Sequence, residues 1–88
     1  MISPVDFPPW SSLVAFRAAA HRQSFKEAAL ELRQTPSAIS HQIKRLESWV
    51  GGPLFDRRVR QVRLTPLGQK LAEGLDRGFG EVSSALSR

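Results

Sequence analysis

Apolar residues recur at helical spacing in four stretches of the chain, and each stretch predicts a helix. Ser11 or Ser12 can cap the first helix, which we expect to stop near Gln23. Ser24 can cap a short second helix, with Glu27 three residues later to complete a capping box. The four apolar stripes are Leu13, Phe16 and Ala20; Phe25, Ala28, Ala29 and Leu32; Ile39, Ile43, Leu46 and Val50; and Leu67, Leu71, Leu75, Phe79, Val82 and Leu86.

A threonine followed by a proline precedes the third and the fourth stripe. Thr35–Pro36 and Thr65–Pro66 each supply a capping hydroxyl and a proline suited to the first helical position. About three residues, 33–35, then connect the second helix to the third, and Gly51-Gly52-Pro53 ends the third. Two short helices with so tight a connector are typical of a helix-turn-helix.

A β-hairpin is predicted between the third and fourth helices. Leu54–Phe55 begins one strand, residues 62–64 form the returning strand, and RRVRQ at 57–61 is the tip. A lone two-stranded hairpin is marginal in water, so its apolar residues must pack on the helices. We therefore expect a mainly α fold: a proline-rich, flexible lead-in over residues 1–9, a winged helix-turn-helix with a two-stranded β wing over 10–64, and a long linker or dimerisation helix over 65–88.

The net charge of +5 is concentrated in one segment. Residues 33–63 hold seven cations against Glu47 and Asp56, whereas the six cations and six anions elsewhere cancel. The seven are Arg33, Lys44, Arg45, Arg57, Arg58, Arg60 and Arg63. This clustering favours a polyanionic partner for the segment over the alternative of a merely solvated surface.

The chain contains no cysteine, which excludes a disulfide or a thiolate metal site and fits a reducing cytoplasm. Its N-terminus has no basic region followed by an apolar run, and no segment approaches about 18 apolar residues. We expect a protein that is neither secreted nor membrane-spanning, located in the cytoplasm at the nucleoid.

The third helix opens with the small residues that a helix needs when its N-terminal end enters the major groove of DNA. Small side chains let the backbone approach the bases, serine hydroxyls can bond to base edges or phosphates, and a helix N-terminus favours a phosphate. His41, Gln42, Lys44 and Arg45 reach farther, to bases or to the flanking backbone. On the wing, Arg58 and Arg60 suit phosphates or an adjacent minor groove. The predicted DNA-contacting residues are Thr35, Pro36, Ser37, Ser40, His41, Lys44, Arg45, Arg58 and Arg60.

Arg57 has two interpretations. It can contact DNA, or it can brace the wing by pairing with Asp56, Glu47 or a helix C-terminus. The histidines argue against a metal site, because His21 and His41 lie on different helices without a third ligand at metal spacing. Ser40 and its neighbour His41 point about 100° apart on a helix, so they cannot form a nucleophile–base pair. We expect neither an enzyme nor a cofactor.

The fourth helix is predicted to hold two copies of the chain together. Gly74, Gly78 and Gly80 each cost about 0.8–1.0 kcal/mol relative to alanine in a helix interior, so an isolated helix would fray. Small residues also permit another helix to approach. The predicted dimerisation residues are Leu71, Leu75, Phe79, Val82 and Leu86. An alternative function is a helical protein-interaction adaptor that uses only this helix. RNA binding is disfavoured because the chain lacks aromatic platforms for unpaired bases.

The run SFKEAALELRQTPSAISHQIKRLESWVGGPLFDRRVRQVRLTPLG resembles the DNA-binding domain of LysR-type transcriptional regulators. The matching pieces are SF…AA at 24–29, SAISHQIKRLE, LFDR at 54–57, Arg60 and LTPLG at 64–68. The resemblance implies a winged helix-turn-helix that binds double-stranded DNA, with a linker helix that pairs two subunits on an inverted repeat. It places Pro36, Ser37, Ser40 and His41 at recognition-helix contact positions and Arg60 on the wing.

The chain departs from the family pattern in two ways. Many members carry Gln in place of Pro36 and Arg in place of His41, so the base preference should differ from theirs. Members also continue into a periplasmic-binding-protein-like effector domain, whereas this sequence ends at Arg88. We therefore expect a DNA-binding fragment rather than a naturally short protein. A small-molecule effector would act only through the missing C-terminal domain, and the full-length protein can form tetramers.

Overall fold

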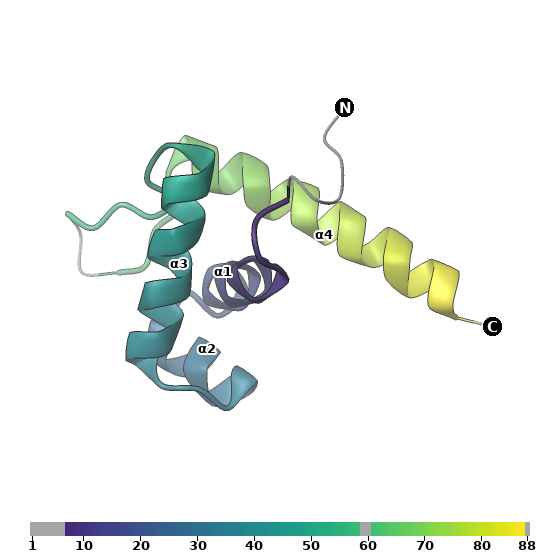
Figure 1. Cartoon of the computed structure of the whole chain (residues 1–88), viewed down its shortest axis with the longest axis horizontal. Coiled ribbons are helices and arrows are strands. Elements are labelled where there is room, and N and C mark those ends of the chain that lie inside the picture. Colours follow the sequence, from purple (N-terminus) through teal and green to yellow (C-terminus); the bar gives the residue numbers. More distant parts are fainter. Residues whose placement is uncertain (1–6, 59–60, 88) are drawn as a thin grey trace.

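A computed structural model describes residues 7–58 and 61–87 of the 88-residue chain. Four helices follow one another: α1 (Trp10–Arg22), α2 (Phe25–Leu32), α3 (Pro36–Val50) and α4 (Pro66–Leu86). Helix α1 contacts the other three, and the C-terminal half of α4 extends away from the bundle (Figure 1). The predicted mainly α fold is confirmed. Residues 1–6 of the predicted lead-in, and Arg60 among the predicted DNA contacts, lie outside the described residues.

The first helix starts earlier than the serines suggested. Pro9 occupies the N-cap position, and its carbonyl oxygen accepts the backbone N–H of Ser12 at 3.0 Å and of Leu13 at 3.4 Å. Ser11 and Ser12 therefore lie inside the helix, which corrects the prediction that one of them caps it. Ser12 is fully buried, and a hydroxyl in that position needs a partner inside the protein.

The other helix N-termini have the predicted capping residues, although the capping box of Ser24 and Glu27 forms only the bond to the Ser24 hydroxyl. The hydroxyl of Ser24 accepts the Glu27 N–H at 3.0 Å, and the hydroxyl of Thr65 accepts the Gly68 N–H at 3.0 Å. Pro36 and Pro66 each occupy the first helical position behind a threonine cap. At the end of α3, Gly51 adopts φ 86°, a left-handed conformation that costs glycine little.

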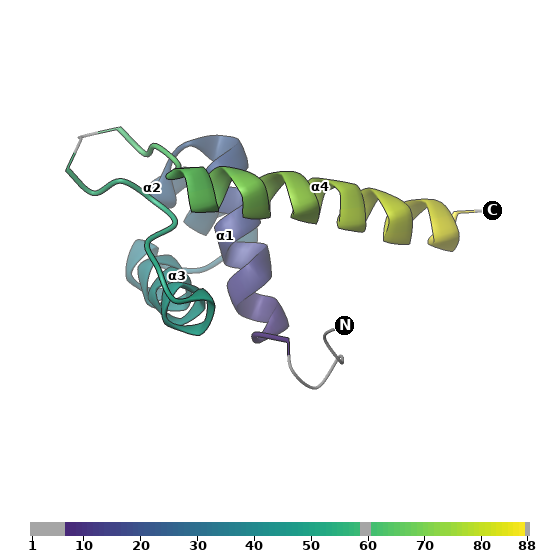
Figure 2. The ribbon, with the colours of Figure 1, turned by 90° about the horizontal axis from the view of Figure 1, so that it is seen from above.

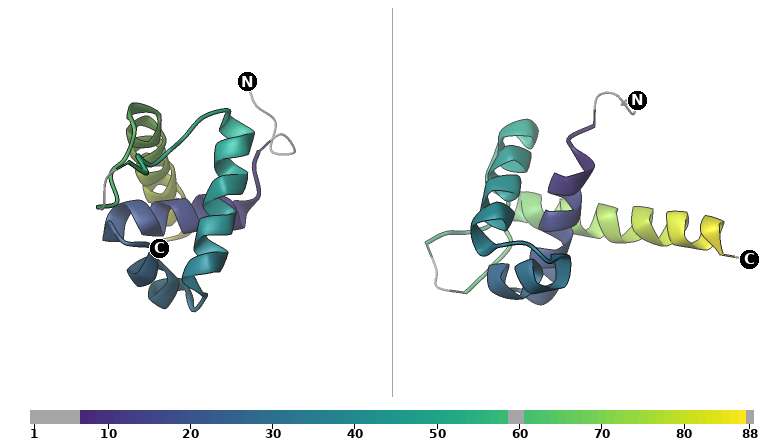
Figure 3. Two further views of the ribbon diagram at one scale, coloured as in Figure 1. Left: turned by 90° about the vertical axis from the view of Figure 1, so that its left-hand side faces the viewer. Right: turned by 60° about the horizontal axis from the view of Figure 1, so that its bottom comes forward.

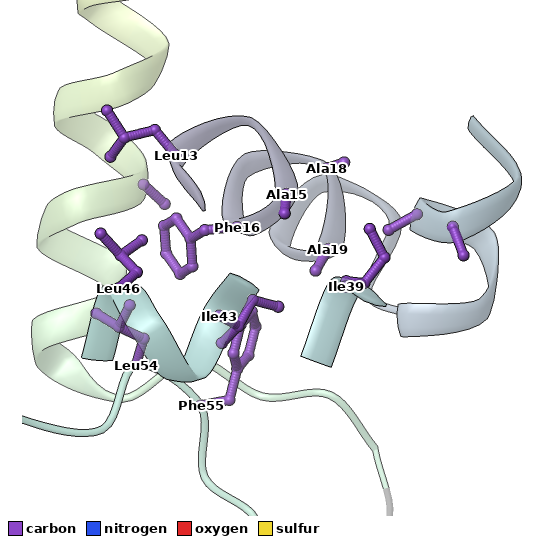
Figure 4. Packing of buried hydrophobic residues seen from close by; sticks show 13 residues of the cluster. Leu13, Ala15, Phe16, Ala18, Ala19, Ile39, Ile43, Leu46, Leu54 and Phe55 are labelled. Carbon is purple, nitrogen blue, oxygen red and sulfur yellow. The ribbon is translucent and has the colours of Figure 1, made fainter. Parts of the chain in front are cut away.

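The core lies where α1 packs against α2 and α3. Phe16, Ile39 and Ile43 have 0% exposed surface (Figure 4). Ala19 and Ala28 are equally buried, and their small side chains let α1 and α2 approach closely. The ring of Phe55 from the hairpin inserts beside Phe16, with the ring centroids 5.5 Å apart. Phe55 and the fully buried Leu54 thereby fasten the hairpin to the helical core.

The hairpin between α3 and α4 contains one antiparallel bridge, Phe55 to Leu64, and no strand among the described residues. Two flanking backbone bonds support the bridge, from the Asp56 N–H to the Arg63 oxygen at 2.8 Å and from the Thr65 N–H to the Leu54 oxygen at 3.0 Å. Beyond them the described arms separate (Figure 2). The predicted two-stranded β wing is therefore not confirmed: the arms pair only where Leu54 and Phe55 are buried, since charged residues beyond that point offer no apolar pairing.

Helix α4 has a packed half and an exposed half. Near its start, a Cβ on Gly68 would lie 2.1 Å from the Leu54 carbonyl oxygen, so only glycine fits against the hairpin. Ala72 is buried, and Leu71 and Leu75 are partly buried against the core. From Asp76 onward the side chains are exposed, apart from the half-buried Phe79. Within the described residues, no helix is long and apolar enough to cross a membrane.

Candidate nucleic-acid interface

The start of α3 presents a surface of small side chains. Thr35, Pro36 and Ser37 are exposed, and Ser40 is half-buried. The hydroxyl oxygen of Thr35 accepts the Ala38 N–H at 3.1 Å, which leaves its proton to donate to another acceptor. A ligand therefore meets a helix N-terminus with little side-chain bulk in front of it.

Ser37, His41 and Lys44 continue this surface along one face of α3, because they are spaced i, i+4 and i+7. Arg45 lies beside this face, and the side chains of Ser37, His41, Lys44 and Arg45 are all exposed. The opposite face of the helix is fixed in the core by three fully buried residues, namely Ile39, Ile43 and Leu46. Across the part of the chain that the structure describes, neither Lys44 nor Arg45 forms an ion pair.

Gln42 belongs to the inner side of α3. Its Oε1 accepts the hydroxyl of Ser12 at 2.8 Å and that of Ser11 at 3.4 Å, and Ser12 is the fully buried serine of α1. This corrects the expectation that Gln42 reaches toward DNA. The Ser12–Gln42 bond instead fixes the orientation of α3 relative to α1, and the satisfied Ser12 hydroxyl explains its burial.

Arg57 braces the hairpin. Its Nη2 donates to Glu47 Oε1 at 3.0 Å, while Glu47 Oε2 accepts the Leu54 N–H at 2.8 Å. The carboxylate at the end of α3 thus holds both the start and the arm of the hairpin. The guanidinium of Arg57 also lies 6.0 Å from the ring centroid of Phe25. Of the two interpretations of Arg57, the structure supports bracing.

Arg58 is held by the second acid of the basic segment. Its Nε donates to Asp56 Oδ1 at 3.0 Å and its Nη2 to Asp56 Oδ2 at 3.1 Å. Together with the Arg58 backbone N–H, this guanidinium lowers the pKa of Asp56 to about 2. The acids Glu47 and Asp56 are therefore both bound to hairpin arginines, whereas Arg33, Arg63 and the two cations of α3 form no ion pair among the described residues.

The helix and the hairpin lie on the same side of the molecule. In Figure 3 (right), α3 and the hairpin occupy one end, and the C-terminal end of α4 points the other way; Figures 1 and 2 agree. The predicted DNA contacts on α3 and Arg58 therefore belong to one end of the domain.

The predicted dimerisation residues divide into two groups. Leu71 and Leu75 are partly used against the core, whereas Val82 is 53% exposed and Leu86 is 77% exposed. Phe79 lies between these groups, with its ring centroid 5.0 Å from that of Trp10. The exposed group lines a groove of about 520 Å³ with residues of α1, namely Trp10, Val14 and Arg17. A Cβ on Gly74, Gly78 or Gly80 would meet nothing within 4 Å.

The two histidines lie in different parts of the molecule. His41 lies on the outer face of α3, whereas His21 Nε2 lies 2.7 Å from Asp76 Oδ1 and links α1 to α4. Arg17 Nε donates to the same oxygen at 3.1 Å. Within the described residues, no three His, Asp or Glu side chains could hold a metal ion together.

Sequence reasoning missed several residues that shape this surface. Gly68 and the Ser12–Gln42 bond position the hairpin and α3, yet neither contacts the outer face. Asp56 was considered only as a partner for Arg57, although it holds Arg58. Its position two residues before an arginine was the available signal, because an Asp side chain commonly accepts the backbone N–H two residues later.

A family model described as a bacterial regulatory helix-turn-helix protein of the lysR family matches residues 10–69. Two curated relatives are from Escherichia coli (strain K12). The HTH-type transcriptional regulator PerR is 43% identical over 79 residues, and the glycine cleavage system transcriptional activator is 44% identical over 78 residues. These stretches cover 90% and 89% of this chain but 27% and 26% of the relatives. The chain thus spans about a quarter of the length of these regulators.

Solved structures show the same architecture. The BenM DNA-binding domain in complex with benA site 1 DNA matches with a TM-score of 0.81 at 30% identity, covering 86% of this chain and 85% of that one. ArgP from Mycobacterium tuberculosis matches with a TM-score of 0.82 at 34% identity, covering 91% of this chain and 30% of that one. Together with the family match over residues 10–69, these similarities show that the chain belongs to the LysR family of bacterial helix-turn-helix regulators.

Proposed function

We propose that this chain is the sequence-specific, double-stranded-DNA-binding part of a LysR-type transcriptional regulator. Helix α3 enters the major groove by its N-terminal end, and the hairpin lies against an adjacent minor groove or its phosphates. The observation that carries the proposal is the outer face of α3, where small residues are followed by two cations without an ion pair in the described part of the chain. The proposal assigns the chain a binding role and no catalytic one.

The similarity to BenM supports this proposal. The DNA-binding domain of that protein was solved with benA site 1 DNA and with catB site 1 DNA, and both complexes match this chain with a TM-score of 0.81. A helix held by its buried face, as α3 is by Ile39 and Ile43, offers its opposite face in a fixed orientation. Such fixed presentation is what base recognition requires.

We propose further that two copies pair through α4 and bind an inverted repeat. The exposed apolar residues Val82 and Leu86, with the groove beside Trp10, supply the surface for this contact. In a longer regulator, tetramers and a small-molecule effector would involve a C-terminal domain. Such a protein would act in the cytoplasm at the nucleoid.

The second candidate function is a protein-interaction adaptor, and the exposed apolar residues at the end of α4 favour it. The two functions differ in their dependence on salt. DNA binding loses affinity steeply with salt, with a log–log slope of about −0.9 for each phosphate neutralised. An adaptor would be indifferent to the charges of α3 and the hairpin.

Selection from a random duplex library across a salt series tests the proposal. Enrichment of an interrupted inverted repeat is expected, and sedimentation should then show two protein chains per duplex. Salt-sensitive binding without an enriched sequence would contradict sequence-specific recognition by this chain. No binding at any salt concentration would favour the adaptor.

A further inference from the structure

The arm of the hairpin carries an arginine that is held at three points by one carboxylate. Asp56 Oδ1 accepts both the backbone N–H of Arg58, at 3.0 Å, and its Nε–H, at 3.0 Å. Asp56 Oδ2 accepts an N–H from Nη2 at 3.1 Å. Asp56 therefore fixes the backbone turn and the side-chain direction of Arg58 together.

This arginine is nevertheless presented to solvent. The side chain of Arg58 is 89% exposed, whereas that of Asp56 is 21% exposed. Arg57, one residue earlier, turns instead toward Glu47. An exposed arginine ordinarily samples many rotamers and loses that freedom on binding. Arg58 is ordered beforehand by Asp56, so a ligand that meets it incurs less of this entropic cost.

The geometry of the pair decides which edge of the guanidinium faces outward. A guanidinium has five N–H donors in a planar fork, and Asp56 uses one on Nε and one on Nη2. The edge formed by Nη1 and Nη2 points away from the carboxylate. The two parallel N–H groups on that edge can donate to two neighbouring acceptors.

We propose that Asp56 is a positioning residue that directs the outer edge of Arg58 to acceptors on base edges in the minor groove, and so contributes to sequence preference. This inference rests on the proposed function. The charge of Arg58 is balanced by Asp56, so attraction to phosphates by counterion release is weak for this pair. The base-edge acceptors N3 and O2 are neutral, and an oriented pair of donors suits them.

The proposal predicts two opposite changes when the carboxylate is removed. Asp56→Asn keeps the oxygen that accepts the Arg58 backbone N–H, so the turn is retained, but it removes the charge and the acceptor for Nη2, which breaks the two-point clamp on the guanidinium. Arg58 then becomes an uncompensated, mobile cation. Affinity for non-specific DNA should rise with a salt slope steeper by about 0.9, because one more phosphate is neutralised. The preference for the selected sequence should fall at the same time.

The experiment measures dissociation constants of the 88-residue chain for the selected duplex and for a scrambled duplex of equal composition, across a salt series. The matched control is Glu81→Gln, which makes the same change of charge on the exposed C-terminal half of α4, away from the hairpin (Figure 1). We divide the dissociation constant for the scrambled duplex by that for the selected duplex. We expect Asp56→Asn to lower this ratio about fivefold or more, as loss of a good bidentate contact does. Glu81→Gln should leave this ratio unchanged.

A second variant separates positioning from a merely structural role. Arg58→Ala should lose the same preference as Asp56→Asn, and the double variant should lose no more than Arg58→Ala alone. A wild-type ratio in Asp56→Asn or in Arg58→Ala would overturn the proposal, as would an equal change in Glu81→Gln. If the wild-type chain binds both duplexes equally, the proposed function fails first. That result is distinct from a wild type that discriminates and an Asp56→Asn variant that discriminates as well.

Discussion

Helix α3 and the hairpin are both rich in cations, but the two regions hold these charges differently. Lys44 and Arg45 on α3 are exposed and without an ion pair among the described residues, whereas Arg57 and Arg58 on the hairpin are bound to Glu47 and Asp56. Both acids of the basic segment are therefore used by the hairpin. A count along the sequence gives the hairpin four cations and α3 only two, yet two of the hairpin arginines are bound to acids whereas both cations of α3 are without an ion pair among the described residues.

The difference separates two tasks that one basic surface can perform. Unpaired cations supply affinity that is independent of sequence and sensitive to salt. Paired arginines are held in place and contribute geometry rather than net charge. The first of the following changes tests this division of tasks and the others test contacts that hold the domain together, in order from the largest expected effect to the smallest.

Removing both unpaired cations of α3 should have the largest effect on DNA binding. If Lys44 and Arg45 each neutralise one phosphate, replacing both by Ala makes the log–log salt slope less negative by about 1.8 and lowers affinity about 60-fold at about 0.1 M salt. Arg57→Ala should change the slope by less than half as much, because Arg57 is bound to Glu47. Fluorescence anisotropy across a salt series measures both. A change of slope in Arg57→Ala that is half as large or larger would contradict the division.

The attachment of the hairpin to α4 can be broken without touching α3. Gly68→Ala places a Cβ 2.1 Å from the Leu54 carbonyl oxygen, so the backbone must shift, at a cost of about 1–3 kcal/mol in stability. Gly74→Ala is the matched control: its Cβ meets nothing within 4 Å, and it should gain about 0.8–1.0 kcal/mol through helix propensity. Urea denaturation of both variants decides the point. A destabilised Gly74→Ala would show that space around the helix is not the determining factor.

Glu47 is the contact between the two regions. Glu47→Ala leaves the half-buried Leu54 N–H without its acceptor and should cost about 1–3 kcal/mol. Glu47→Gln keeps an acceptor and loses only the charge opposite Arg57, so its cost should be smaller. Thermal denaturation followed by circular dichroism compares them. Equal losses of stability would assign the effect to the ion pair instead.

The smallest effect is expected for Asp76 of α4, which contacts Arg17 and His21 of α1. Hydrogen bonds from His21 and then from Arg17 lower the pKa of Asp76 below its ordinary value of 3.8. Because the folded-state pKa is the lower one, this stabilisation is present above about pH 4 and is lost as the pH falls through the folded-state pKa. The exposed pair should contribute about 0.2–1 kcal/mol. Urea denaturation at several pH values should show that the free energy of unfolding of Asp76→Asn lacks this pH-dependent contribution. The same loss of stability in acid as in the wild type would contradict the prediction.

The local chemistry of the chain predicted most helix boundaries. Caps at Ser24, Thr35 and Thr65 depend on residues at most three positions away, so they can be recognised without the fold. Pro9 replaced the expected serine cap because Ser12 is taken into the core by Gln42, 30 positions along the chain. Such long-range pairings are not visible in a local pattern.

The outer face of α3 could be predicted because it is the complement of an apolar stripe of helical period. The detailed shape of the hairpin could not be predicted, since it depends on individual side-chain hydrogen bonds. Asp56 turns to Arg58 and Glu47 turns to Arg57, and these bonds replace the ladder that a second strand would have formed. The apolar residues on either side of the RRVRQ tip predicted the position of the hairpin but not its short pairing.

Because one carboxylate at the end of α3 binds the Leu54 N–H and Arg57, the helix and the base of the hairpin are held at a constant separation. On a duplex, these two elements would contact the groove and the neighbouring backbone together, as one unit. DNA whose curvature or groove width differs from that separation must deform to touch both. The elastic energy of this deformation depends on base sequence, so under the proposed function the domain would favour some sites over others even at base pairs that no side chain reaches.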